Sequence, residues 1–177
     1  FDKHVPVFTV EGDTVYGAIG DDMVWTISPK DGGWYILEDN LRIPSGASYP
    51  MIARNICRKV APETFVENHI ADNRNYSEIL ADMMNEMNQG RGINVILTPG
   101  RYNSAFFEHS YLAEKTGATL AFPGDLVVED DVCSSTFLYN EKQRVGAIYR
   151  RVSDEYMDPL AFEPSSLIGI PNLMSAY

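Results

Sequence analysis

The sequence predicts an α/β fold of the mixed α+β kind, in which an antiparallel β ribbon is followed by helices and then by a βαβ unit. Two short runs rich in β-branched and aromatic residues, 22–27 and 34–40, flank a turn made of Ser, Pro, Lys, Asp and Gly. Further along, an apolar run at 93–100 leads through a helical pattern at 102–117 into another apolar run at 118–122. Strand, helix and strand with short connections predict a parallel pair with a right-handed crossover.

The composition limits the partners and the compartment. Hydrophobic residues make up 45% of the 177 residues and charged residues 22%, as in an ordinary globular protein. The net charge of −11 argues against a nucleic acid or an anionic membrane as partner. Cys57 and Cys133 lack metal-ligand spacing, which predicts buried thiols in a reducing compartment, with one disulfide as the alternative. We therefore expect a cytoplasmic protein.

Helices are predicted between the ribbon and the βαβ unit. In the stretch 50–60, Ile52, Ile56 and Val60 recur at helical spacing. A clearer helix covers 75–89, where the apolar residues fall on one face and Gly90 follows as a stop signal. We expect this face to pack on a sheet rather than to bind a ligand. It consists of Ile79, Leu80, Met83, Met84 and Met87.

Three more strands are expected after the βαβ unit, at 125–131, 133–140 and 144–151. A change of composition near residue 91 suggests a boundary between two lobes. The first lobe, 1–90, would contain the ribbon and its helices. The second lobe, 91–177, would contain the βαβ unit.

Polar side chains gather where the second strand of the ribbon ends. Side chains alternate between the two faces of a strand, so Glu38, Asn40 and Arg42 share one face if the strand extends that far. Carboxylate and amide oxygens are ligands that Mg²⁺ prefers, and an arginine beside them would neutralise substrate phosphate. The partner strand offers Asp21 and Asp22 as a third oxygen ligand. The alternative is a solvated strand edge with a surface ion pair.

A second polar group follows the strand at 93–100, which ends in a Pro-Gly turn. Asn103 or Ser104 would cap the next helix, and a helix N-terminus at the carboxyl end of a strand attracts anions. Contacts to a substrate carboxylate are therefore predicted for Arg101, Tyr102, Asn103 and Ser104. The alternative is ordinary capping of a βαβ helix.

Two further pairs of residues are candidates for a catalytic or binding role. Glu108 and His109 either form a catalytic pair, or His109 is a structural histidine bonded to backbone. Arg150 and Arg151 lie on opposite faces of a strand, so that one of them, taken to be Arg150, would bind a substrate anion while the other is solvated. The acids that would pair with these arginines are Asp154, Glu155 and Asp158.

Three stretches resemble signatures of one family. They are WYILEDNLRIPSGASY (34–49), ILTPGRYNSAFFEHSYLA (96–113) and IYRRVSDEYMDPLAF (148–162). Together they are similar to the circularly permuted ATP-grasp proteins, the group that includes glutathionylspermidine-synthase-like ligases, and they occur in the order found in that family. The resemblance implies that the ribbon belongs to the permuted ATP-grasp lobe and that the βαβ unit belongs to a lobe on the substrate side.

The resemblance also implies roles for residues. It implies Glu38 and Asn40 as Mg²⁺ ligands, Asp22 as the first metal-binding acid, and Arg42 as the catalytic residue that contacts the ATP phosphates. Trp25 stands where relatives often carry Arg. Two phosphate groups repel an incoming nucleophile, and cations beside them cancel that charge in the transition state.

The function that the resemblance implies is an ATP- and Mg²⁺-dependent carboxylate–amine ligase that acts through an acyl phosphate. The lysines of this chain lie in no phosphate-binding context, so we expect a fragment, truncated at both ends, that lacks most of the ATP pocket and is inactive alone. Its partners would be small or peptide-like carboxylates and amines and the remainder of the same protein. The alternative is a non-catalytic binding or scaffold module. The lysines are Lys3, Lys30, Lys59, Lys115 and Lys142.

Overall fold

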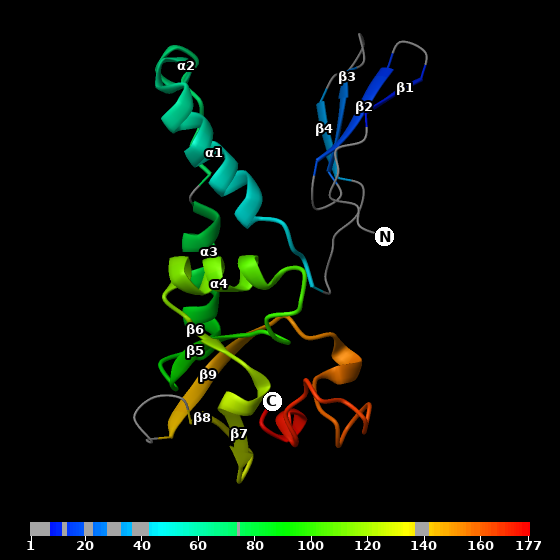
Figure 1. The fold of residues 1–177 in the computed structure, drawn as a ribbon, viewed down its shortest axis with the longest axis vertical. Coiled ribbons are helices and arrows are strands. Elements are labelled where there is room, and N and C mark those ends of the chain that lie inside the picture. Colours follow the sequence, from blue (N-terminus) through cyan, green and yellow to red (C-terminus); the bar gives the residue numbers. More distant parts are fainter. Residues whose placement is uncertain are drawn as a thin grey trace. The chain divides into compact units, whose positions relative to one another are not determined.

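The computed structural model describes four short strands within residues 8–36 and then residues 43–73, 75–136 and 142–177. The chain divides into two compact units, Phe1–Gly46 and Ala47–Tyr177. Each unit is described by itself below (Figure 1).

The first unit contains a four-stranded antiparallel sheet with the strand order β1-β2-β3-β4. Trp25 lies opposite Trp34 in the pairing of β3 with β4, which confirms the predicted ribbon. β4 is described as far as Ile36. The strands are β1 (Phe8–Glu11), β2 (Thr14–Ile19), β3 (Met23–Ile27) and β4 (Gly33–Ile36).

The second unit begins with three helices: α1 (Ser48–Val60), α2 (Pro62–Glu67) and α3 (Asn75–Asn88). Pro62 occupies the first turn of α2, where its missing N–H costs no hydrogen bond. Arg54 of α1 holds the connection after α2, because its Nε donates to the carbonyl of Ala71 at 2.8 Å. Its guanidinium also lies 5.2 Å from the ring centroid of Phe65. None of the described helices is long and apolar enough to cross a membrane.

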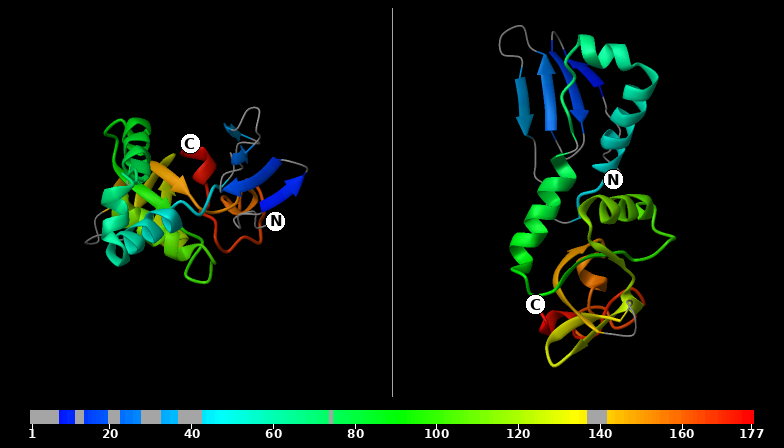
Figure 2. Two further views of the ribbon diagram at one scale, coloured as in Figure 1. Left: turned by 90° about the horizontal axis from the view of Figure 1, so that it is seen from above. Right: turned by 90° about the vertical axis from the view of Figure 1, so that its left-hand side faces the viewer.

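The sheet of the second unit has five strands in the order β6-β5-β9-β8-β7. Strand β5 runs parallel to both of its neighbours, β6 and β9, whereas β7, β8 and β9 pair antiparallel. The predicted βαβ unit is confirmed, since α4 (Phe106–Thr116) joins the parallel strands β5 and β6. Figure 2 shows the long strand β9 curving through this sheet. The strands are β5 (Ile93–Leu97), β6 (Thr119–Ala121), β7 (Leu126–Glu129), β8 (Val132–Ser135) and β9 (Gln143–Arg150).

The two faces of β5 build two hydrophobic clusters. Ile96 packs with Leu80 and Met84 of α3 and with Leu112 of α4. Val95 points to the other face, where β7, β8 and the C-terminal segment supply the partners of a second cluster. Burial of each such side chain contributes about 1.5–3 kcal/mol to stability. The second cluster contains Val95, Leu97, Ala121, Leu126, Cys133, Val152, Ile170 and Leu173.

The packing face of α3 is narrower than the sequence predicts. Leu80 and Met84 are buried, but Ile79, Met83 and Met87 are 61%, 46% and 66% exposed. The reason is that α3 contacts β9 and α4 through a single stripe of residues spaced by three and four positions. The apolar residues beside that stripe remain on the surface of this unit. The prediction that all five pack on a sheet is wrong for these three.

The expected lobe boundary near residue 91 falls inside a tight joint between α3 and β5. The side-chain amide of Asn88 donates to the carbonyl of Gly92 at 2.7 Å, and the N–H of Gly92 donates back to Asn88 Oδ1 at 3.1 Å. A Cβ on Gly146 of β9 would come within 1.9 Å of the same Oδ1. The two compact units of the chain divide after Gly46, and α3 packs on the sheet that follows it. The boundary near residue 91 between two functional lobes stays a prediction.

Both cysteines are free thiols. Cys133 is buried as predicted, and burial raises the pKa of its thiol to about 11. Cys57 lies exposed on α1, so the prediction that it is buried is wrong.

Candidate functional site

The parallel strands β6, β5 and β9 end at the same edge of the sheet. Thr98 follows β5, Phe122 follows β6, and Arg151 follows β9 at that edge. In open α/β sheets, ligands bind outside the carboxyl ends of the strands, where chain connections leave a strand toward opposite sides. The connection from β5 leads through α4 to β6, while β9 lies on the other side of β5. This edge is therefore the candidate site.

A turn at 98–105 joins β5 to α4. Gly100 has a φ of 128°, a conformation that favours glycine, and its carbonyl accepts the N–H of Asn103 at 3.2 Å. Oδ1 of Asn103 accepts the N–H of Ala105 at 2.9 Å, which is an Asx turn. The residue at the N-cap is Ala105, so the predicted cap at Asn103 or Ser104 is wrong. The side chain of Asn103 instead closes the preceding turn, and the helix begins four residues later than expected.

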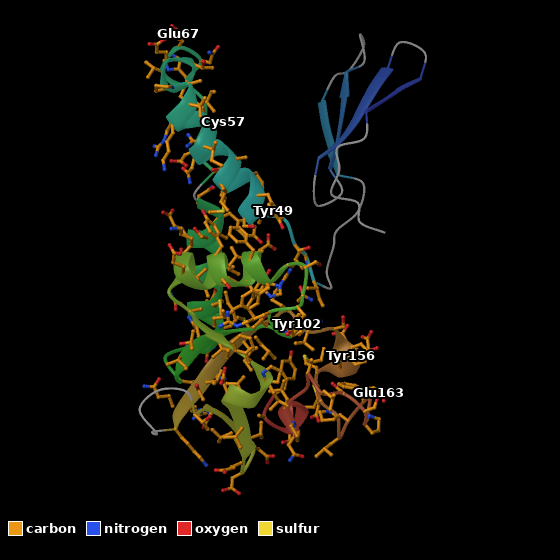
Figure 3. All side chains as sticks on the ribbon, in the orientation of Figure 1. Tyr49, Cys57, Glu67, Tyr102, Tyr156 and Glu163 are labelled. Atoms are coloured by element: carbon orange, nitrogen blue, oxygen red, sulfur yellow. The ribbon has the colours of Figure 1, made fainter. Side chains whose placement is uncertain are left out.

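Arg101 is held on two aromatic rings at this edge. Its guanidinium carbon lies 5.7 Å from the ring centroid of Phe106 and 5.9 Å from that of Phe122. The two rings are themselves 6.1 Å apart, one at the start of α4 and one at the end of β6. Arg101 and Ser104 are exposed, and Tyr102 is fully exposed on the same turn (Figure 3). The platform orders the guanidinium and leaves it accessible to an anion.

Arg150, the last residue of β9, and Arg151, which follows it, differ in burial and in partner. The side chain of Arg150 is partly exposed, donates to the carbonyl of Val152 at 2.9 Å and forms an ion pair with Asp154. This ion pair confirms one of the expected acid partners. Arg151 is buried and pairs with Glu108, so the prediction that it is solvated is wrong. Among the arginines that the described residues place at this edge, only Arg101 lacks a carboxylate partner, which distinguishes it as the cation available to a ligand.

A buried network joins α1, α4 and the end of β9. Oε2 of Glu108 accepts both the N–H of Ser48 at 3.2 Å and its hydroxyl at 2.9 Å. The other carboxylate oxygen lies 3.6 Å from a guanidinium nitrogen of Arg151. All three side chains are almost completely buried. A carboxylate at the start of α1 also interacts favourably with the helix dipole.

His109 lies beside this network. Its Nδ1 is 2.8 Å from Oγ1 of Thr98, and both residues are buried. Burial and then the neighbouring charge of Arg151 lower the pKa of His109 to about 4, so the imidazole is neutral at pH 7. Glu108 and His109 thus bond to different partners rather than to each other. His109 is structural, as one alternative predicted, but its partner is a side-chain hydroxyl rather than backbone.

Asp158 does not pair with an arginine, contrary to expectation. The buried carboxylate accepts backbone N–H groups from Leu160 at 2.9 Å, Asn172 at 3.2 Å and Met174 at 3.0 Å. Burial alone would raise its pKa, but these hydrogen bonds outweigh that effect and lower it. Asp158 therefore closes the C-terminal segment over one face of the sheet.

The predicted metal and phosphate ligands lie outside the described residues: Asp22, Glu38, Asn40 and Arg42. Within the part of the chain that the structure describes, no group of three His, Cys, Asp or Glu side chains could hold a metal ion. The magnesium site stays a prediction.

Sequence reasoning missed Ser48 and Thr98. Ser48 is 60 residues from Glu108, and no local periodicity signals such a contact. Thr98 belongs to an apolar strand pattern, and only its place directly before a Pro-Gly turn sets it apart.

Comparison with known proteins gives consistent results. A family model described as "Circularly permuted ATP-grasp type 2" matches residues 1–177. An uncharacterized protein of Synechocystis sp. is 40% identical over 149 residues, which cover 82% of this chain and 31% of the relative. An uncharacterized protein of Mycobacterium tuberculosis H37Rv is 39% identical over 148 residues, or 82% of this chain and 27% of the relative.

A third relative, from Frankia casuarinae, carries the name "Putative glutamate--cysteine ligase 2-2". It is 33% identical over 147 residues, which cover 81% of this chain and 17% of that protein. The chain thus spans less than a third of the length of each of these relatives.

Proposed function

Because the chain belongs to the circularly permuted ATP-grasp type 2 family, we propose that it is part of an ATP- and Mg²⁺-dependent carboxylate–amine ligase. In this reaction an oxygen of the substrate carboxylate attacks the γ-phosphorus of ATP, and ADP leaves. The amine nitrogen then attacks the acyl carbon, phosphate leaves, and the nitrogen loses a proton. The Frankia relative, whose name denotes a ligase that joins a carboxylate to an amine, supports this proposal.

The chemistry of the predicted metal ligands fits Mg²⁺. Asp22, Glu38 and Asn40 offer only oxygen donors, which hard cations prefer. These residues lie outside the described strands, so their proximity stays a prediction. A bound cation would neutralise charge on the ATP phosphates.

Arg101 is the residue we assign to the substrate carboxylate. The observation that supports this role is its position on two rings at the carboxyl edge of the sheet, without an acid partner among the described residues. A guanidinium pairs with a carboxylate through two parallel hydrogen bonds, so one arginine suits one carboxylate. In a chain with a net charge of −11, an ordered cation also attracts an anionic substrate locally.

The metal assignment is tested in the full-length protein. Glu38→Ala should abolish ADP release in the presence of Mg²⁺ and candidate acids and amines, with L-glutamate and L-cysteine as the first pair. The far-ultraviolet circular dichroism spectrum should stay that of the wild type. Glu86→Ala, on the exposed side of α3, is the matched control and should keep full activity. Turnover of Glu38→Ala at the wild-type rate would reject the metal assignment.

The carboxylate assignment is tested separately. Arg101→Ala should raise KM for the carboxylate substrate by about 10- to 100-fold, because a charge-assisted hydrogen bond contributes about 1.5–3 kcal/mol. KM for ATP should change little. Arg91→Ala is the control, since Arg91 is exposed and bonds to Gln89. An equal rise in both KM values, or none, would contradict the role of Arg101. Nucleotide binding by the full-length protein without ADP release would favour a scaffold instead.

A further inference from the structure

One hydroxyl at the end of β5 connects three parts of the candidate site. Oγ1 of Thr98 bonds to Nδ1 of His109 in α4 at 2.8 Å and accepts the N–H of Gly100 at 3.3 Å. The backbone N–H of Thr98 donates to the carbonyl of Ala121 in β6 at 3.0 Å. Strand end, helix and turn are therefore held by a single residue.

The burial of this pair excludes direct contact with a ligand. Thr98 is 0% exposed and His109 is 1% exposed. Polar groups buried this completely cost free energy unless they are hydrogen-bonded, so each needs the other. A pair that touches no solvent acts on a bound molecule only through the residues that it holds in place.

The turn that the pair holds carries Arg101. Gly100 stands between Thr98 and Arg101, and its φ of 128° is the step that redirects the chain out of the strand. The hydrogen bond from the N–H of Gly100 to the threonine hydroxyl fixes this step. The direction that the chain takes at Gly100 decides whether the guanidinium of Arg101 reaches the rings of Phe106 and Phe122.

We propose that Thr98 and His109 are positioning residues for Arg101: their buried hydrogen bond sets the Gly100 turn and so keeps the guanidinium on its aromatic platform, in place for a carboxylate. The proposal rests on the carboxylate-binding role proposed above for Arg101. It assigns to His109 a function in ligand affinity without proton transfer.

The test uses a spectroscopic signature of the platform. Nuclear magnetic resonance of the 177-residue chain should show the Arg101 Nε–H signal displaced by the ring currents of Phe106 and Phe122, and the signal is assigned by its loss in Arg101→Ala. Thr98→Val keeps the shape of the side chain but removes the hydroxyl, and should return the signal toward that of a solvated arginine. His109→Phe removes the same bond from the other partner and should do likewise.

Two controls separate positioning from general stability. Thr98→Ser keeps the hydroxyl and should keep the displaced signal. Thr116→Val makes the same chemical change as Thr98→Val at the far end of α4, where the hydroxyl donates to the carbonyl of Leu112 at 2.7 Å. It should leave the Arg101 signal unmoved. An unmoved signal in both Thr98→Val and His109→Phe, or an equal displacement in Thr116→Val, would overturn the proposal.

Titration with L-glutamate adds the functional arm. The wild-type Arg101 signal should shift on addition, and Thr98→Val should raise Kd on the order of tenfold, the loss expected for about one hydrogen bond. If L-glutamate and other carboxylates leave the wild-type signal unchanged, the carboxylate site is refuted, while the ring-current comparison still decides the positioning role. Equal Kd values for wild type and Thr98→Val would overturn the link between positioning and affinity.

Discussion

Removing the carboxylate of Glu108 should destabilise the second unit severely. The side chains of Glu108 and Arg151 are 2% and 1% exposed, so Glu108→Ala leaves a guanidinium buried without this counter-charge. Loss of one member of a buried ion pair costs about 3–5 kcal/mol. The same change removes the acceptor for both the N–H and the hydroxyl of Ser48. We therefore expect a loss of about 4 kcal/mol.

The assay is equilibrium unfolding in urea followed by circular dichroism at 222 nm. This signal reports on α1 to α4, which all lie within the unit Ala47–Tyr177. With an m-value of about 2 kcal/mol per molar urea, the midpoint should fall by about 2 M. Glu114→Ala on the same helix is the control, because the Glu114 side chain is 72% exposed and its ion pair with Lys115 is worth less than about 1 kcal/mol.

A double-mutant cycle decides whether the ion pair causes the loss. Glu108→Leu combined with Arg151→Met replaces both charges by apolar groups, and buried pairs replaced in this way are often neutral or even stabilising. The double variant should therefore be more stable than the sum of the two single variants predicts, by at least about 2 kcal/mol. Additive losses, or a loss below about 1 kcal/mol for Glu108→Ala, would refute the reasoning.

Two further predictions concern stability. Burial, with the charge of Arg151, lowers the pKa of His109 to about 4, so the unfolded chain takes up the proton first as the pH falls. Between pH 7 and 4 the free energy of unfolding of the wild type should therefore fall by about 3 kcal/mol more than that of His109→Phe, as measured from urea midpoints. An equal fall in the wild type and in the variant would contradict this prediction. A Cβ on Gly92 would lie 2.0 Å from the carbonyl oxygen of Arg144, whereas one on Gly124 meets nothing within 4 Å. Gly92→Ala should lower the free energy of unfolding by about 3 kcal/mol and Gly124→Ala by less than about 0.5 kcal/mol. Similar thermal unfolding midpoints for the two variants would contradict the close packing of Gly92 on β9.

Local patterns in the sequence predicted most elements of the fold. The apolar runs at 93–100 and 118–122 and the helical spacing between them were enough to identify the parallel pair, because a strand, a helix and short connections are all local signals. The position of β9 was not predictable in this way. Its residues read as a strand, but its pairing with β5 joins Ile93 to Val145, and such distant pairing leaves no periodicity. The prediction of which α3 residues are buried was wrong for a related reason, since the elements packed against the helix decide which apolar residues are covered.

The candidate site was predicted in part. The residues 101–104 after the Pro-Gly turn were identified as a place for an anion, and the structure leaves Arg101 available there. Alternation placed Arg150 and Arg151 on opposite faces, but it predicted a solvated Arg151, because the burial of that side chain depends on Glu108 in a distant helix. The buried partners Ser48 and Thr98 could not be found, because a serine or threonine signals its role only through the side chains that surround it. The metal ligands, from Asp22 to Arg42, stay a prediction.

The place of β9 in the sheet has a consequence for synthesis on the ribosome. β5 lies between β6 and β9, so a nascent chain that has reached only residue 142 exposes the whole edge of β5 that later pairs with β9. Open strand edges of this kind recruit other chains into aggregates. The edge of β5 therefore stays without its partner strand until Arg150 has left the exit tunnel. A ribosome that stalls before that point would release a product with an open strand edge, which chaperones bind.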